Sequence, residues 1–326
     1  MKTRTFLKRL GCGLLTATLL GGGAAMAQDY PTQTIRLVVP FPPAGVADIL
    51  GRMLSQRLAT PYGQSIVVDN RPGASGHLGA QLVAKAPPDG YTLMVGTIGI
   101  HAAYASYSKL TYSPASELQP ILILGEAPNI VLVPASSPFK TFPELLAFAK
   151  ANPGKLNYAS AGPGSSVHMV TALFELESGA KMNHVPYKGS GPALIDLIGG
   201  QVDLMFDNMS SSVPHIQSGK LRALAVTSAK RNAILPNVPT IAESGVPAYA
   251  GTSWWTLAAP AGTPPAVIDK LNRDVLRAVA APDAQKQLTA LGVTITPNTP
   301  AEAQAYFKSE TLKWGRVIEA AKLKLD

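Results

Sequence analysis

The stretch TIRLVVPFPPAGVADILGRML, residues 34–54, places a strand pattern, a loop pattern and a helix pattern in direct succession. The apolar run from Ile35 to Val39 is typical of a buried strand, and it stops at prolines and a glycine. Apolar residues then recur at helical spacing over 47–59. A strand that enters a helix through a loop of small residues leaves the first backbone N–H groups of the helix free to bind an anion. That anion is a phosphate, a catalytic intermediate or a free organic acid.

The first 27 residues have the pattern of a cleaved secretory signal peptide. A basic start precedes an apolar run from Leu10 to Leu20, and the small-x-small site Ala25-Met26-Ala27 follows. The apolar run is too short to span a bilayer, and no later stretch reaches the ~18 apolar residues of a membrane helix. We therefore expect a soluble mature protein in the periplasm.

Charge and cysteine content exclude several classes of function. Cys12, the only cysteine, lies inside the predicted signal peptide, so the mature chain has no disulfide, thiol nucleophile or zinc–thiolate site. The signal peptide carries four of the 28 Lys and Arg and none of the 20 Asp and Glu, which leaves a formal charge of +4. This mild charge without dense basic runs disfavours nucleic acid as a partner and suits small anions.

Short apolar runs alternate with helical patterns along the rest of the chain. Strands are predicted at 34–39, 65–70, 91–97, 128–135, 156–161, 182–186, 202–206 and 221–228, and helices at 47–59, 77–86, 143–151, 166–178, 192–198, 265–281, 283–290 and 300–321. This order predicts an α/β fold with mostly parallel sheets flanked by helices. The Pro/Gly-rich stretch 236–253 suits a return crossing between domains. We therefore expect a discontinuous domain 1 (28–128 plus 254–326) and an inserted domain 2 (129–253).

The loop at 40–48 does not match the nucleotide-binding patterns. A phosphate loop needs G-x-x-x-x-G-K-[ST], but the Gly-Lys pairs at 154–155 and 219–220 are each followed by leucine. A dinucleotide fingerprint needs three glycines, and 40–48 contains only Gly45. We expect no cofactor here, and a plain tight turn is the alternative to an anion site.

A catalytic or metal centre is also hard to assemble. A nucleophile elbow around Ser75 would need glycine where His77 stands. No two of the histidines, 77, 101, 168, 184 and 215, have the spacing of a metal site on one helix, so we expect no metal. His101 and His168 lie near predicted loops, where each either bonds a ligand or fills a structural role. Asp207 ends a strand, at the edge of the sheet where ligands of α/β proteins bind.

Ordered motifs along most of the chain resemble one known family. VVPFPPAGVADILGRML, VVDNRPGASGHLGA, APPDGYTL, PGKLNYAS, HVPYKGSGPAL, GGQVDLMFDN, GKLRALAVTSAKR, LPNVPTIAESG and APAGTPPAVIDKLN resemble the Bug family, the periplasmic solute-binding proteins of tripartite tricarboxylate transporters. The resemblance implies a two-lobed periplasmic binding protein fold of type II. It also implies an interdomain cleft that closes on a di- or tricarboxylate, an acidic amino acid or an aromatic acid, held chiefly by backbone amides and ordered waters.

Carried over to this chain, the family's binding loops are 41–48 and 187–193. The family loop commonly reads P-F-P-P-G-G, and Ala44 stands here at the first glycine. Together with the residue pattern, this gives an expected ligand-binding set of Phe41, Pro42, Ala44, Gly45, Asp48, Thr97, His101, Ser160, Ser165, His168, Tyr187, Gly189, Ser190, Pro192, Ala193 and Asp207.

The expected function is capture of an organic acid and its delivery to membrane permease subunits. The protein is expected to be a monomer and not an enzyme, because no nucleophile with a positioned base is found. A ligand-sensing module for a sensor kinase and a periplasmic hydrolase are the alternatives. The residues do not identify the acid.

Overall fold

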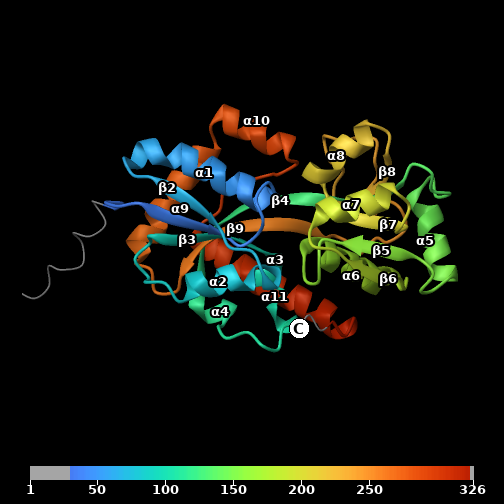
Figure 1. Cartoon of the computed structure of the whole chain (residues 1–326), viewed down its shortest axis with the longest axis horizontal. Coiled ribbons are helices and arrows are strands. Elements are labelled where there is room, and N and C mark those ends of the chain that lie inside the picture. Colours follow the sequence, from blue (N-terminus) through green and yellow to red (C-terminus); the bar gives the residue numbers. More distant parts are fainter. Residues whose placement is uncertain (1–29, 324–326) are drawn as a thin grey trace, which may run out of the picture.

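The computed structural model describes residues 30–323, so the predicted signal peptide lies outside them. The described chain forms two lobes, which lie left and right in Figure 1. Lobe 1 contains β1 (Ile35–Val39), β2 (Ile66–Asn70), β3 (Thr92–Thr97), β9 (Thr252–Pro260), α1 (Val46–Tyr62), α2 (His77–Ala84), α3 (Ile98–His101), α4 (Pro114–Glu117), α9 (Pro265–Val279), α10 (Pro282–Ala290) and α11 (Pro300–Ala320). Lobe 2 contains β5 (Asn157–Ser160), β6 (Asn183–Pro186), β7 (Leu204–Asn208), β8 (Leu221–Val226), α5 (Phe142–Ala151), α6 (Ser166–Ser178), α7 (Ser190–Ile198) and α8 (Met209–Gln217).

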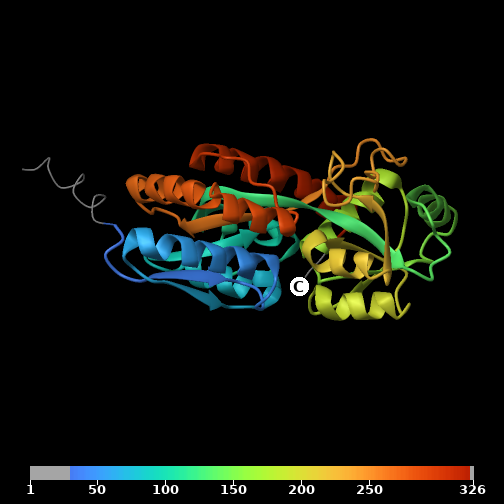
Figure 2. The same cartoon turned by 90° about the horizontal axis from the view of Figure 1, so that it is seen from above.

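One long strand, β4 (Leu118–Pro134), belongs to both lobes and bridges them in Figure 2. Its first part pairs with β9 as far as Pro128, opposite Thr252, and its second part pairs with β7 from Asn129, opposite Asn208. The strand order is β2-β1-β3-β9-β4-β7-β5-β6, and β8 pairs with the second part of β4. The two lobes therefore share a continuous strand path, and β4 and β9 carry the chain across the junction.

Strand directions make the carboxyl ends of the two sheets face each other. β1, β2 and β3 are parallel to one another. β9 is antiparallel both to β3 and to β4, so β1, β2 and β3 run in the same direction as β4, from lobe 1 into lobe 2. β7 is antiparallel to β4, and β5 and β6 follow β7, so these three strands run toward lobe 1. The loops after all six strands consequently meet at the junction, the edge where α/β sheets bind ligands.

The core is continuous behind this junction. Trp254 and Trp255 are adjacent on β9 and point to opposite faces: Trp254 packs with α6 and α11 residues, and Trp255 packs in the core of lobe 1. Helix α11 slants in Figure 1 from lobe 1 to the lower edge of lobe 2, and it contacts α3 and α6. The carboxylate of Glu310 on α11 accepts hydrogen bonds from the indoles of Trp254 (2.8 Å) and Trp314 (2.7 Å). These contacts fix α11 against the crossing strands.

Besides the short helices α3 and α4, the structure has the first half of β4, all of β9 and helix α8, which the apolar patterns did not predict. The first half of β4, from Leu118 to Ala127, is a strand that continues directly into the predicted one at 128–135. β9 begins at Thr252, where the sequence favoured the end of a crossing loop. Helix α8 contains Pro214 and three serines, which mask its helical pattern. β4 and β9 are antiparallel, so the sheet is mixed at the centre and parallel toward both outer edges.

Candidate functional site

All of the expected site residues lie at the facing sheet edges. Thr97, Ser160 and Asp207 stand at or next to the ends of their strands, and the others lie in the loops that follow strands or in the first turns of the next helices. Lobe 1 contributes Phe41, Pro42, Ala44, Gly45, Asp48, Thr97 and His101, and lobe 2 contributes Ser160, Ser165, His168, Tyr187, Gly189, Ser190, Pro192, Ala193 and Asp207. The fold thus brings two groups that are more than 50 residues apart in sequence to one junction. Their individual environments differ, and several of them support the loops rather than line the junction.

The β1–α1 loop is held from within lobe 1 by Asp48. The Asp48 carboxylate accepts hydrogen bonds from the Ala44 amide (3.0 Å), Arg52 (2.9 Å) and Asn70 (2.9 Å), and Asn70 also donates to the Phe41 carbonyl (3.1 Å). Burial raises the pKa of Asp48, but these three hydrogen bonds outweigh burial and leave its pKa below the ordinary value. With 3% of Asp48 exposed, its carboxylate shapes the loop and is not directed at an anionic ligand.

The exposed part of this loop presents backbone. Ala44 has φ 70°, in the left-handed region that an alanine side chain disfavours. Gly45 is the N-cap of α1 and supplies no side-chain cap, so the first amides of α1 have no side-chain acceptor at that position. The amide of Ala44 itself is committed to Asp48. The amides of the first turn of α1 are therefore the donors that an anion at this edge would meet.

The two expected site residues after β3 have different environments: Thr97 lies at the sheet edge and His101 lies in the core. Thr97 is the half-buried N-cap of α3. His101 is 3% exposed, and its ring stacks on Phe307 at 4.5 Å between ring centroids. Neither ring nitrogen has a partner within residues 30–323, and burial lowers the pKa of His101 to about 3. His101 is thus a neutral histidine packed behind the junction, away from the expected ligand position.

In lobe 2, the β5–α6 loop is organised by its own side chains. Ser160 accepts from the Gly162 amide (3.1 Å), Ser165 donates to the Gly162 carbonyl (2.7 Å), and His168 Nδ1 accepts from the Gly164 amide (3.0 Å). The His168 ring stacks on His184 at 4.1 Å, and burial lowers the pKa values of these two histidines to about 3 and 4. Ser165 also caps α6 by accepting from the His168 amide (3.3 Å). These residues fix the loop and have little hydrogen-bonding capacity left for a ligand.

The β6–α7 loop resembles the β1–α1 loop in its backbone. Gly189 is the N-cap of α7 with φ 112° and no side-chain cap. Pro192 is exposed in the first turn, and Ala193 is fully buried against the core of lobe 2. The Tyr187 hydroxyl donates to Asp196 on α7 (2.7 Å), so its proton is used within lobe 2.

Asp207 anchors the start of α7 from beneath. Its fully buried carboxylate accepts from the hydroxyls of Ser190 (2.5 Å), Ser211 (2.6 Å) and Ser212 (3.0 Å). Burial raises the pKa of Asp207, and the three hydroxyls oppose that increase. Asp207 therefore positions the N-terminal turns of α7 and α8, and Ser190 can only accept a further hydrogen bond while its proton stays with Asp207.

Three supporting residues were missed from the sequence. Asn70 joins Asp48 to the Phe41 carbonyl, and Ser211 and Ser212 complete the set around Asp207. The serine run directly after Asp207 was a usable signal, because hydroxyls within five residues of a buried carboxylate are natural donors. Asn70 ends β2, next to β1, and only the strand order identifies it.

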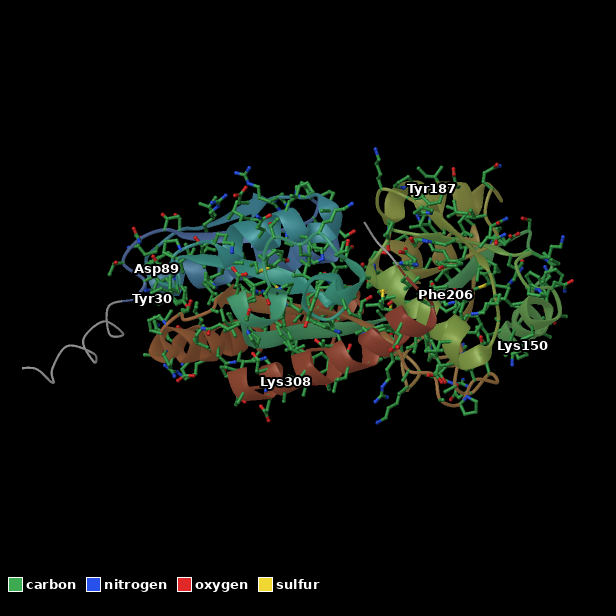
Figure 3. All side chains as sticks on the ribbon, turned by 90° about the horizontal axis from the view of Figure 1, so that it is seen from below. Tyr30, Asp89, Lys150, Tyr187, Phe206 and Lys308 are labelled. Carbon is green, nitrogen blue, oxygen red and sulfur yellow. The ribbon has the colours of Figure 1, made fainter. Side chains whose placement is uncertain are left out.

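Within residues 30–323, no cluster of three or more His, Asp or Glu suits a metal ion, and no helix is long and apolar enough to cross a membrane. A cavity of about 430 Å³ lies between α6, His184 and the end of α11, with Pro163 and His168 in its wall. A second of about 390 Å³ lies between β4 and the start of α11. Figure 3 shows the charged ends of the molecule, with Asp89 at the far end of lobe 1, Lys150 at the far end of lobe 2 and Lys308 on α11.

Residues 50–323 match the family model described as the tripartite tricarboxylate transporter family receptor. A protein of Pseudomonas sp. strain P51, encoded in the tcbD-tcbE intergenic region, is 39% identical over 95% of this chain and 93% of its own length. The protein BugT of Bordetella pertussis is 36% identical over 96% of this chain and 97% of its own length.

Solved structures agree with this assignment. R. palustris Rpa4515 with adipate has a TM-score of 0.84 at 39% identity, covering 90% of this chain and 99% of that one. MatC of Rhodopseudomonas palustris with bound malate has a TM-score of 0.81 at 34% identity, covering 89% and 100%. The resemblance read from the sequence motifs and the two-lobed α/β fold are thereby confirmed. The chain belongs to the tripartite tricarboxylate transporter receptor family of periplasmic solute-binding proteins.

Proposed function

We propose that this protein captures a small organic carboxylate at the junction between its lobes and delivers it to the permease subunits of a tripartite tricarboxylate transporter. The ligand's carboxylate is held by backbone amides at the start of α1 and of α7. Adipate in one relative and malate in another support a dicarboxylate as the ligand class. The periplasm is the proposed location, in keeping with the signal-peptide pattern of residues 1–27.

The facing helix starts are the observation that carries this proposal. Both α1 and α7 begin at a glycine N-cap with no side-chain acceptor, directly after parallel strands whose carboxyl ends face the junction. By contrast, α5 and α11 begin with complete capping boxes at Thr141 and Thr299. Free amides at the positive ends of two helix dipoles stabilise an anion placed between them.

The charges around the junction suit a carboxylate bound mainly by neutral donors. Arg52 and Arg71 are paired with Asp48 and Asp69. Lys188, next to the Gly189 cap, is exposed and has no ion pair within the described chain. Neutral amides avoid the desolvation cost of a buried salt bridge. Lys188 is the candidate partner for the second carboxylate of a dicarboxylate.

We further propose that the lobes are domains 28–128 plus 254–326 and 129–253, moving about the two crossing strands. The change of pairing partner on β4 between Pro128 and Asn129, and the start of β9 at Thr252, support hinges at these positions. Donors on opposite lobes grip one ligand only when the lobes come together, so closure depends on the ligand.

Among the alternatives, a receptor family is at odds with a hydrolase. The Ser160 hydroxyl lies 2.6 Å from His184 Nε2, but Ser160 is fully buried and also accepts from the Gly162 amide, so no substrate can reach this pair as a nucleophile and base would require. The sensory role shares the same binding step and differs in the membrane partner. Co-purification from membranes with either permease subunits or a sensor kinase separates these two roles.

Binding is tested by thermal unfolding and calorimetric titration of residues 28–326, refolded to remove bound ligand, with adipate, malate, citrate, glutamate and benzoate. At a ligand concentration of a hundred times Kd, the stabilisation is about 2.7 kcal/mol, which raises Tm by roughly 5–10 °C. We expect this shift with at least one dicarboxylate. A folded protein that shifts with none of these acids would contradict the proposal.

A further inference from the structure

In addition to the crossing strands and the packing of α11 on α6, loops of the two lobes meet at the junction. The Ser75 hydroxyl in lobe 1 donates to the carbonyl of Pro163 in lobe 2 at 2.8 Å. The Tyr107 hydroxyl, also in lobe 1, donates to the same carbonyl at 3.4 Å. One carbonyl oxygen in lobe 2 therefore accepts from two separate segments of lobe 1, which uses both of its lone pairs.

The loop that presents Pro163 is rigid. Both of its neighbours, Gly162 and Gly164, are buried, and their amides bond to Ser160 and His168 within lobe 2. Pro163 itself is exposed at the tip. The carbonyl is thus held at a fixed position on the surface that lobe 2 turns toward lobe 1.

The loop that presents Ser75 is equally constrained and carries backbone strain. Residues 73–76 all have positive φ, including Ala74 at 46° and Ser75 at 53°, which are conformations that residues with a Cβ disfavour. A Cβ on Gly76 would lie 2.9 Å from Ile100 and 3.2 Å from Phe41, so close packing under the loop requires glycine there. Strained backbone of this kind concentrates where a loop has a binding task.

A second close approach lies beside these hydrogen bonds. A Cβ added to Gly99 on α3 would stand 2.8 Å from the Gly164 carbonyl oxygen, and every neighbouring atom within 4 Å of it belongs to Gly164. This close contact comes from lobe 2 and not from another element of lobe 1. An alanine at 99 is therefore tolerated within lobe 1 and obstructs only the approach of the other lobe.

We propose that Ser75, Tyr107 and Gly99 form a latch with residues 162–164 that holds the lobes together and slows release of the captured acid. These residues do not belong to the amide sites at α1 and α7. The latch acts by stabilising the arrangement in which both sites face one ligand, because its contacts are lost when the lobes separate. The inference rests on the proposed function for its ligand, but the distances between the lobes test it without any ligand.

The first test uses Gly99→Ala, with Gly315→Ala as the matched control. Gly315 lies in α11 with open space around it, so this control adds a methyl group to a helix without affecting the lobes. Spin labels at Lys109→Cys in lobe 1 and Glu177→Cys in lobe 2, both exposed, report the interlobe distance in a mature chain with no other cysteine. For the ligand-free protein, we expect Gly99→Ala to give a broader and longer distance distribution than Gly315→Ala. Identical distributions would overturn the latch.

The second test measures adipate and malate binding to Ser75→Ala, with Ser218→Ala as its control. Ser218 donates to the His215 carbonyl within lobe 2, so this control removes the same type of hydrogen bond away from the junction. Loss of one neutral hydrogen bond is expected to raise Kd about three- to tenfold, mainly through a faster off-rate. Unchanged Kd and off-rate in Ser75→Ala, with wild-type binding intact, would contradict the latch. Absence of wild-type binding would contradict the proposed function instead, and the label distances would still decide the latch.

Discussion

The two amide sites at the junction have the same backbone plan but are supported by different chemistry. In lobe 1, the loop before α1 is held by Asp48, whose partner Arg52 has a side chain that is 51% exposed. In lobe 2, the start of α7 is held by Asp207, a fully buried carboxylate surrounded by three serine hydroxyls. A buried carboxylate can thus order an anion-binding loop either with the help of a solvent-exposed ion pair or through neutral donors alone. The stability of the fully buried Asp207 site depends far more on the presence of each hydrogen-bond donor than that of the Asp48 site does.

The largest expected effect is that of Asp207→Asn. The amide keeps the shape but offers an NH₂ group where buried hydroxyls need an acceptor, so the free energy of unfolding should fall by about 2–4 kcal/mol. The control is Asp203→Asn in the same lobe, where one carboxylate oxygen accepts a single backbone amide, from Asn157. Urea unfolding of both variants measures the difference. A loss below about 1 kcal/mol for Asp207→Asn would mean that the serines are satisfied without the carboxylate.

Acid should destabilise the protein through buried histidines of both lobes. Burial lowers the folded-state pKa of His101 and His168 to about 3, against 6.5 when unfolded. The unfolded chain therefore binds more protons below pH 6.5, and each group costs about 1.4 kcal/mol per pH unit as pH falls from 6.5 toward its folded pKa. Asp207 and Glu175, whose pKa values burial raises, oppose this trend at lower pH.

The two lobes also differ in the hydrogen bonding of these histidines: His168 in lobe 2 accepts a backbone hydrogen bond, and His101 in lobe 1 has no hydrogen-bond partner within residues 30–323. His168→Leu should lose stability even at pH 7.5, because the Gly164 amide then lacks its acceptor. His101→Leu removes two unpartnered nitrogens, so its main effect should be a shallower fall in stability between pH 6.5 and 4.5. Urea unfolding at pH 7.5, 5.5 and 4.5 measures both. The same pH slope in His101→Leu as in the wild type would contradict the assignment of His101 as a buried neutral group.

The smallest expected effect is that of Asp48→Asn in lobe 1. One amide oxygen cannot serve the Ala44 amide, Arg52 and Asn70 together, so a loss of about 1–2 kcal/mol is expected. Arg52→Gln is the control and should cost under about 1 kcal/mol, because an exposed ion pair contributes little. Adipate affinity should fall with Asp48→Asn as the loop loosens. A larger loss of stability than in Asp207→Asn would reverse the comparison between the lobes.

Much of the fold was predictable because strand and helix patterns alternate and are separated by clear proline and glycine turn signals. The strand–loop–helix units at 34–59 and at 182–198 follow from apolar runs broken by proline and glycine, and the structure has them in those places. The crossing strands were harder. β4 continues through a glycine and two prolines, and β9 follows a Pro/Gly-rich segment, so local turn signals outweighed pairing that only the tertiary structure provides.

The site was predictable as a set of loops but not as a set of roles. The sequence indicated polar groups at a ligand-facing edge for Asp48, Asp207 and Tyr187. In the structure, each of these side chains is hydrogen-bonded within its own lobe. A sequence shows that a polar residue follows a strand, but the direction of its side chain depends on partners such as Asn70. His101 lies only four residues after Thr97, and one turn of helix carries it from the junction into the core.

Hydrogen exchange of backbone amides, measured by mass spectrometry with and without adipate or malate, tests the central claim most directly. If an acid is gripped by amides of both lobes, the first turns of α1 and α7, residues 45–49 and 189–193, should both gain protection from the ligand that binds. Protection in only one of these segments, or protection confined to the cavity beside α6 and the end of α11, would contradict the two-sided amide site.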